Sequence, residues 1–320
     1  MPPVEPMPTG EFRMVQQQSV LAYTQPDGEE EDTTRTGRVG DIRLFTMLLG
    51  GAVGAAIASR SYTAEAQQKW LIFAIVATLL GAAAGEAFGF GLSRWAEVRQ
   101  YHVIKRWRAW FSVLVILVFA AGLIAATPYI FRGKTPLEQI TATDNLTVNG
   151  ISLSVLAIMG GLPIALTLAA IKQVVSDPLP GGPGAQLDIL LRLRRMTSRM
   201  LNQLGVLVLL VMGVNAAAIG WGKVQQDPNV SIFSGVVASL VVAMMFVPTA
   251  SNLRKRGAIY VERYFPLATV ATSNLITAAE DRGKLEKMLG LDQTTFGELK
   301  TGLVVLTPVV VGALASLVKF

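Results

Sequence analysis

The residue of this chain best suited to chemistry is a carboxylate inside an apolar segment. Glu86 lies within residues 70–92, about six residues or ~9 Å of helix rise from the end of that segment. A charge near the centre of a bilayer costs ~2.5–3.5 kcal/mol on insertion scales, so such a residue is functional or is neutralised. We consider two roles for Glu86: a proton-linked or cation-attracting group in transport, or a neutral side chain hydrogen-bonded to a neighbour such as Asn202 or Asn215.

Residue types that support other chemistry are scarce. The chain has no cysteine, which excludes disulfides, thiolate metal sites and cysteine nucleophiles. Its single histidine, His102, lies among basic residues with no second metal ligand nearby. Catalysis usually needs at least two titratable groups that converge. We therefore expect no catalytic site, no metal site and no cofactor, and an enzyme is the least favoured class.

A second candidate lies in the middle of the apolar segment 151–175. Proline removes one backbone hydrogen bond from a helix and clashes with the carbonyl group four residues earlier. We expect Gly160, Gly161 and Pro163 to kink or break the helix at this point. Transporters use broken helices near the middle of the membrane to bind substrates. Proline kinks also occur in membrane helices of every role.

Basic residues that could contact phosphate groups recur between residues 186 and 204. Apolar residues occur there at steps of three and four, and a charged stripe contains Asp188, Arg192, Arg195 and Arg199. The pattern predicts an amphipathic helix that runs into the next apolar segment. The three arginines are interpreted either as the solvated face of a helix that packs on its own bundle, or as contacts for lipid head groups or a partner.

These residues must be positioned by membrane helices. The chain has 320 residues, of which 52% are hydrophobic and 16% charged, whereas soluble domains carry roughly 25% charged residues. Apolar runs of about 20 residues cross a hydrocarbon core ~30 Å thick. Seven candidate segments are present: 44–59, 70–92, 109–131, 151–175, 203–221, 232–249 and 301–318. We predict an all-α polytopic bundle of about seven spans; because the first segment is short, six spans is the alternative.

The distribution of Lys and Arg predicts the orientation. The loops at 93–108, 176–202 and 250–300 are richer in these residues than the loops that alternate with them. Cytoplasmic loops carry this excess, so the N-terminus is predicted to be cytoplasmic. The positive charge therefore reflects membrane insertion, and we expect no nucleic-acid partner.

The domain organisation follows from the same boundaries. Residues 1–42 are polar and Pro-rich, which is typical of a disordered cytoplasmic tail. Residues 43–320 should form the helix bundle. Within it, cytoplasmic helical segments are expected at about 93–108, 180–202 and 254–300.

An internal repeat is the strongest pattern in the sequence. Residues 48–58 and 79–89 both begin Leu-Leu-Gly and continue with a small residue at every fourth position. The glycines of this predicted glycine zipper are Gly50, Gly54, Gly81, Gly85 and Gly89. Small residues at this spacing let helix backbones approach closely in lipid. The two helices should pack against each other or against copies in another subunit. A leucine at Gly91, which is off the stripe, should be less disruptive than a leucine at Gly85.

Two functions are compatible with these features. A transporter or channel subunit for an unidentified ion or small solute is the leading prediction, which Glu86, the break expected at Pro163 and the glycine stripes favour; a scaffold is the alternative. A non-catalytic membrane scaffold or complex subunit, which docks a partner through its cytoplasmic helices and tail, explains the scarcity of polar residues in the spans. We expect the lipid bilayer, and either a homo-oligomer or a membrane complex, as partners. The expected location is a bacterial cytoplasmic membrane.

The predicted orientation can be tested by cysteine labelling, since the native chain has no cysteine. A cysteine introduced at position 140 should react with a membrane-impermeant maleimide only from the external side. Labelling of that cysteine only from the cytoplasmic side would overturn the orientation.

Overall fold

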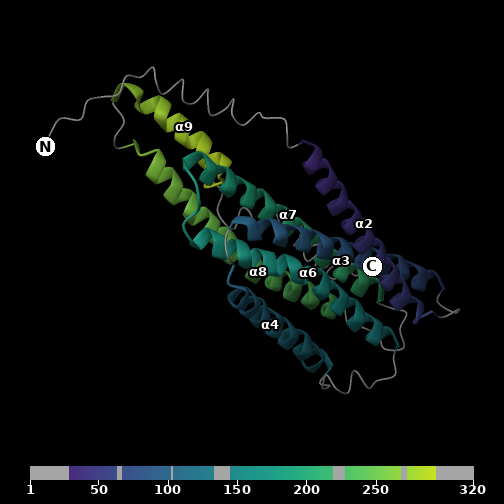
Figure 1. The fold of residues 1–320 in the computed structure, drawn as a ribbon. Helices are drawn as coiled ribbons and strands as arrows, with labels where there is room; N and C mark the ends of the chain where they lie inside the picture. The colour runs from purple at the N-terminus through teal and green to yellow at the C-terminus, as the bar shows by residue number, and fades with distance from the viewer. Residues whose placement is uncertain are drawn as a thin grey trace. The chain divides into compact units, whose positions relative to one another are not determined.

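The computed structural model describes residues 29–62, 67–101, 104–132, 145–218, 228–267 and 272–292. The regular structure of these residues is helical, with no strand among them. The elements that Figure 1 labels are α2 (Glu29–Ser59), α3 (Gln67–Tyr101), α4 (Arg106–Arg132), α6 (Asn145–Ser176), α7 (Pro183–Ala218), α8 (Pro228–Tyr264) and α9 (Leu275–Met288), and a short 3₁₀ helix, η4 (Thr272–Asn274), precedes α9. Hydrocarbon offers the backbone no hydrogen-bond partner, so apolar segments of this length form helices.

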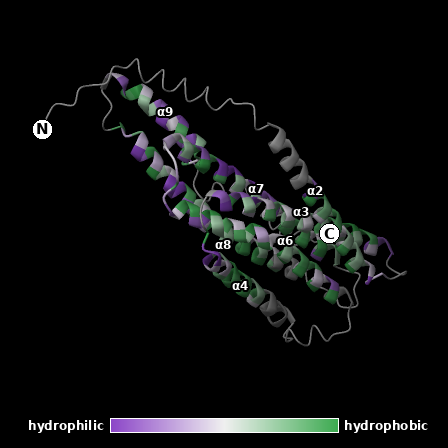
Figure 2. Cartoon of the chain, viewed as in Figure 1, coloured by the Kyte–Doolittle hydropathy of each residue, from purple (hydrophilic) through white to green (hydrophobic). Residues whose placement is uncertain are grey.

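Six of these helices are long and apolar enough to cross a membrane. Their candidate spans are Asp41–Ser59, Gln67–Gln100, Arg106–Leu123, Val148–Ser176, Pro183–Ala218 and Gly235–Tyr264. They coincide with the first six predicted segments, including the short first one. Figure 2 shows hydrophobic residues along these helices and mixed polarity in α9. The all-α fold with several apolar helices is thus confirmed, whereas the seventh segment, 301–318, lies outside the described residues.

Several helices extend beyond their apolar segments. The predicted amphipathic stretch and the fifth span form the single helix α7, as expected. Helix α8 continues to Tyr264, and α9 ends at Met288. Helix α2 begins at Glu29, so residues 29–42, which were expected to be disordered, are helical. The chain divides into two units, Met1–Ile42 and Arg43–Phe320. The second unit contains all of the candidate site residues.

Helices α2 and α3 approach each other closely along the glycine stripes. A Cβ atom added to Gly50 would overlap the carbonyl group of Gly81, and one added to Gly54 would overlap that of Ala77. A Cβ atom on Gly85 would overlap the carbonyl group of Thr46. A step of four residues toward the C-terminus of α2 thus matches a step of four residues toward the N-terminus of α3. The two helices therefore cross in antiparallel orientation. At the other end of the α2–α3 contact, the indole N–H group of Trp70 donates a hydrogen bond to the Ala58 carbonyl oxygen (3.0 Å).

Helix α3 also packs against α6 and α7. Its residues at steps of three and four are almost completely buried: Phe73, Ala77, Leu80, Ala84 and Ala87. A Cβ atom on Gly160 of α6 would lie 2.6 Å from the Ala84 carbonyl oxygen. Gly161 faces Leu204 of α7 instead. The two predicted helix-break glycines therefore pack against two different helices.

The predicted break in α6 does not occur. The helix runs without interruption from Asn145 to Ser176, with Pro163 inside it. The Thr167 hydroxyl lies 2.7 Å from the Pro163 carbonyl oxygen and 3.1 Å from that of Gly91 on α3. This hydroxyl therefore joins the proline turn of α6 to the backbone of α3. Pro163 thus belongs to a helix contact.

Gly91 also lies in a close helix contact, although it is off the stripe. A Cβ atom there would lie 2.7 Å from both the Ile164 nitrogen and the Pro163 Cβ atom. Gly91 is off the stripe that faces α2 but lies on the surface that faces α6. The sequence pattern identified one glycine face of α3, and the tertiary structure uses two.

Substitution of Gly85 should test the α2–α3 contact. Gly85→Leu should destabilise the protein by about 2–3 kcal/mol or more, because the side chain would separate two backbones in contact. The thermal melt of the detergent-solubilised protein measures this loss. Gly122→Leu in α4 is the matched control, since among the described residues no atom outside the neighbouring backbone of α4 lies within 4 Å of a Cβ added at Gly122. Equal melting temperatures for the two variants would contradict the close contact.

Candidate functional site

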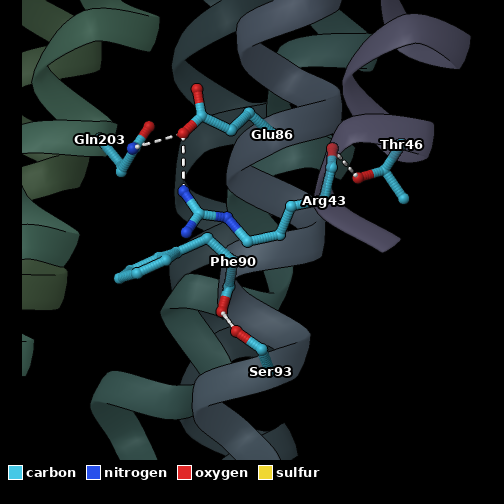
Figure 3. A network of polar contacts seen from close by, with 6 residues as sticks. All are labelled: Arg43, Thr46, Glu86, Phe90, Ser93 and Gln203. Carbon is cyan, nitrogen blue, oxygen red and sulfur yellow. Dashed lines mark hydrogen bonds and ion pairs between the residues drawn. The ribbon is translucent and has the colours of Figure 1, made fainter. Parts of the chain in front are cut away.

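Glu86 forms an ion pair across the α2–α3 crossing. The Arg43 Nη2 atom lies 2.8 Å from the Glu86 Oε1 atom. Gln203 of α7 donates a second hydrogen bond, of 3.2 Å, to the same oxygen. Figure 3 shows Arg43 and Gln203 meeting the carboxylate from different helices. The partners of Glu86 are therefore a cation and an amide, instead of the expected Asn202 or Asn215.

The position of Arg43 accounts for two unusual features of the sequence. The apolar run of α2 begins at Leu44 and is shorter than that of α3, so Arg43 lies level with residues inside the α3 run. Gly89 lies next to Arg43, because a Cβ atom there would be 3.3 Å from the Arg43 Cα atom. Because the first span is short, its flanking Arg43 lies where it can neutralise the carboxylate of the second span. Pairing reduces the cost of placing either charge in the membrane.

The sequence contained a signal for this pair. If the two glycine stripes face each other in antiparallel order, Gly85 lies opposite Thr46, and Arg43 then lies one helical turn away. Residue 86 follows Gly85 directly, so its side chain comes within reach of Arg43. The repeat alone is compatible with packing within one chain or between copies. It therefore does not determine which residues of the two helices lie opposite each other.

A second arginine lies close to this pair. The guanidinium carbons of Arg43 and Arg94 lie 5.2 Å and 5.3 Å from the centre of the buried Phe90 ring. Arg94 forms an ion pair with Glu97, and Arg192 of α7 lies 4.0 Å from the same carboxylate. We call the end of the bundle that holds these residues the basic end. Cation–π contacts of this kind contribute ~0.5–2 kcal/mol each.

The arginines predicted to contact lipid or a partner differ in their surroundings. Arg195 and Arg199 are exposed. The Arg192 side chain is 57% exposed and approaches Glu97. Leu193, Met196 and Met200 of the same helix are buried. The amphipathic helix is thus present, with its apolar side in the bundle.

The basic end also holds α9 in place. Arg194 of α7 donates a hydrogen bond to the Met288 carbonyl oxygen (3.0 Å), and Arg254 of α8 donates one to that of Leu291 (3.1 Å). Gly290 has a φ angle of +60° and ends the helix in a Schellman motif, with its backbone N–H group bonded to Lys287 and that of Leu291 to Glu286. Cations near the C-terminus of a helix also stabilise its dipole. The C-terminal end of α9 is therefore fixed to α7 and α8.

The loops at this end are tied to neighbouring helices. The Tyr260 hydroxyl donates to the Pro183 carbonyl oxygen (2.8 Å) at the start of α7. The Gln173 side chain accepts a hydrogen bond from the Lys105 backbone N–H group (3.1 Å) and donates to the Lys105 carbonyl oxygen (3.4 Å). These contacts join the α3–α4 connection to α6 and the start of α7 to α8.

Comparisons with known proteins give no family. No protein-family model matches the chain, and no curated protein or solved structure matches it. The function is therefore inferred from the residues and their geometry alone.

A double-mutant cycle should measure the Arg43–Glu86 pair. Glu86→Gln and Arg43→Gln should each destabilise the protein by about 1–3 kcal/mol, because each leaves the partner charge uncompensated. The double variant should lose less stability than the two single losses combined, since it leaves no unpaired charge. Thermal melts in detergent give all three values. Glu262→Gln, at an exposed position of α8, is a control that should change stability by less than about 0.5 kcal/mol. Additive losses would contradict the pairing.

Proposed function

We propose that this chain is a non-catalytic scaffold or complex subunit of a bacterial cytoplasmic membrane. In this proposal it has seven spans and a cytoplasmic N-terminus. The extensions of α7 and α8, together with α9, form a cytoplasmic platform that docks a partner. The excess of Lys and Arg at the basic end supports this orientation.

The observation that carries the proposal is the way in which α9 is held. A helix of 14 residues is marginally stable alone. The arginine hydrogen bonds and the buried Leu285 and Leu289 fix its C-terminal part. Leu275 and Ile276 at its other end are 42% and 76% exposed. Apolar side chains presented on an anchored helix are suited to contact with a partner protein.

The glycine stripes are proposed to act as a zipper within one chain. Gly50, Gly54, Gly81 and Gly85 each already face the backbone of the other helix, which leaves no space for a second copy along that surface. A homo-oligomer would therefore have to use other faces of the bundle.

Transport remains a second candidate, because both members of the Arg43–Glu86 pair are about one-third exposed. An accessible ion pair in a span could attract a solute or respond to protons. Against this candidate, the pair is explained by the α2–α3 crossing, and α6 is unbroken. A proteoliposome flux assay with an ion panel tests this second candidate. Solute flux that Glu86→Gln abolishes, in a protein that still folds, would favour transport over the scaffold.

Site-specific photocrosslinking in native membranes should test the scaffold proposal. A photoreactive residue at position 276 should give a discrete protein adduct. The same residue at position 118 of α4, where Val118 is 64% exposed on a candidate span, should react with lipid alone. Arg194→Ala should reduce the adduct at position 276 severalfold, because it releases the end of α9. Lys284→Ala, on an exposed part of α9, should leave it unchanged. The absence of a discrete adduct at positions 275 and 276 would overturn the proposal.

A further inference from the structure

Helices α3 and α7 run antiparallel at the basic end and present one matched stripe of residues each. Glu86 contacts Gln203, and Glu97 approaches Arg192. The number of residues between Glu86 and Glu97 on α3 equals the number between Arg192 and Gln203 on α7. Phe90 of α3 and Arg199 of α7 lie on these stripes at the same level, because steps of four and seven residues keep to one helix face.

This arrangement brings an excess of positive charge to one place. Four guanidinium groups (Arg43, Arg94, Arg192 and Arg199) lie along the stripes with three carboxylates (Glu86, Glu97 and Asp188), which leaves one positive charge in excess. We call this set of residues the arginine cluster. Arg195 lies on the adjacent part of α7 and adds to the excess. Guanidinium groups crowded together in this way repel one another unless an anion joins them.

Two donors of the cluster lack an acceptor. Among the described residues, neither the Arg43 Nε atom nor the Arg94 Nε atom has a hydrogen-bond partner, although both atoms are buried. Both guanidinium groups lie against the same ring, that of Phe90. A buried donor without a partner costs ~1–3 kcal/mol. An oxyanion that accepts hydrogen bonds from these donors would relieve that cost.

The surroundings of the cluster favour an amphiphilic anion over a free one. Arg43 immediately precedes the apolar run of α2, and the α3 run ends at Leu92, so the cluster lies where apolar segments meet polar ones. The apolar side chains of Leu44 and Phe45 on α2 are 60% and 66% exposed. Val206 of α7, on the same face as Arg199, is 48% exposed. These side chains provide an apolar surface for acyl chains next to the guanidinium groups.

We propose that the arginine cluster between α2, α3 and α7 binds the phosphate head group of an anionic phospholipid. Arginine forms bidentate hydrogen bonds with phosphate, and basic pockets between membrane helices bind anionic head groups. Arg94 and Arg199 contact the phosphate, and Arg43 closes the site while it holds Glu86. This assignment is independent of the proposed scaffold function.

Binding of dioctanoyl phosphatidylglycerol to the detergent-purified protein, measured by native mass spectrometry, tests the site. Arg199→Gln should weaken binding about fivefold, as expected for roughly 1 kcal/mol per arginine. Addition of Arg94→Gln should weaken binding about fivefold more. Arg199 is exposed, so its replacement should leave the fold intact, which the thermal melt without lipid verifies. Arg106→Gln, an exposed basic position on α4, is the matched control and should bind normally.

Two further binding measurements distinguish an anionic lipid from a zwitterionic lipid and from free inorganic phosphate. Dioctanoyl phosphatidylcholine should bind at least tenfold more weakly than the anionic lipid, and inorganic phosphate should not compete at millimolar concentration. Equal weakening in Arg106→Gln and Arg199→Gln would overturn the site, since binding would then follow net charge. Effective competition by inorganic phosphate, or equal binding of the zwitterionic lipid, would also overturn the proposal.

Discussion

The close approach of α2 and α3 is the contact on which the placement of the polar residues depends. Lipid removes the hydrophobic drive between helices, so van der Waals contact between backbones takes its place. Because the glycines leave the carbonyl groups of one helix against the Cα atoms of the other, the crossing permits one register. That register places Arg43 beside Glu86 and Ala58 beside the Trp70 indole. A larger residue in the stripe would remove all of these contacts together.

Helix α3 connects the bundle because it is contacted on several faces. One face meets α2 through glycines, a second meets α6 through Ala84 and Gly91, and a third meets α7 through the charged stripe. This shared packing also explains why α6 stays helical at Pro163, since the surrounding helices hold that segment from both sides. The proline therefore forms part of the contact surface between α6 and α3.

Many of the polar interactions among the described residues lie at the basic end of the bundle. At this basic end, arginines serve different tasks according to their neighbours. Arg43 neutralises a carboxylate, Arg194 and Arg254 hold the end of α9, and Arg199 is exposed. The planar guanidinium group suits each task because it offers several donors in a fixed geometry. The residue type whose distribution predicts the orientation of the chain thus also organises the helix ends.

The sequence by itself determined the helical class, the positions of six apolar helices and the continuity of the amphipathic stretch with the fifth span. These features depend on local composition and periodicity, which a single segment contains. The tertiary structure decided the partner of Glu86, the second glycine surface at Gly91 and the unbroken course of α6. Each of these depends on which helix lies alongside another and in what register, because a charge or a proline is satisfied by neighbours far away in the chain. Arg43 and Glu86 illustrate the difference: each is visible in the sequence, but only the crossing of α2 and α3 makes them a pair.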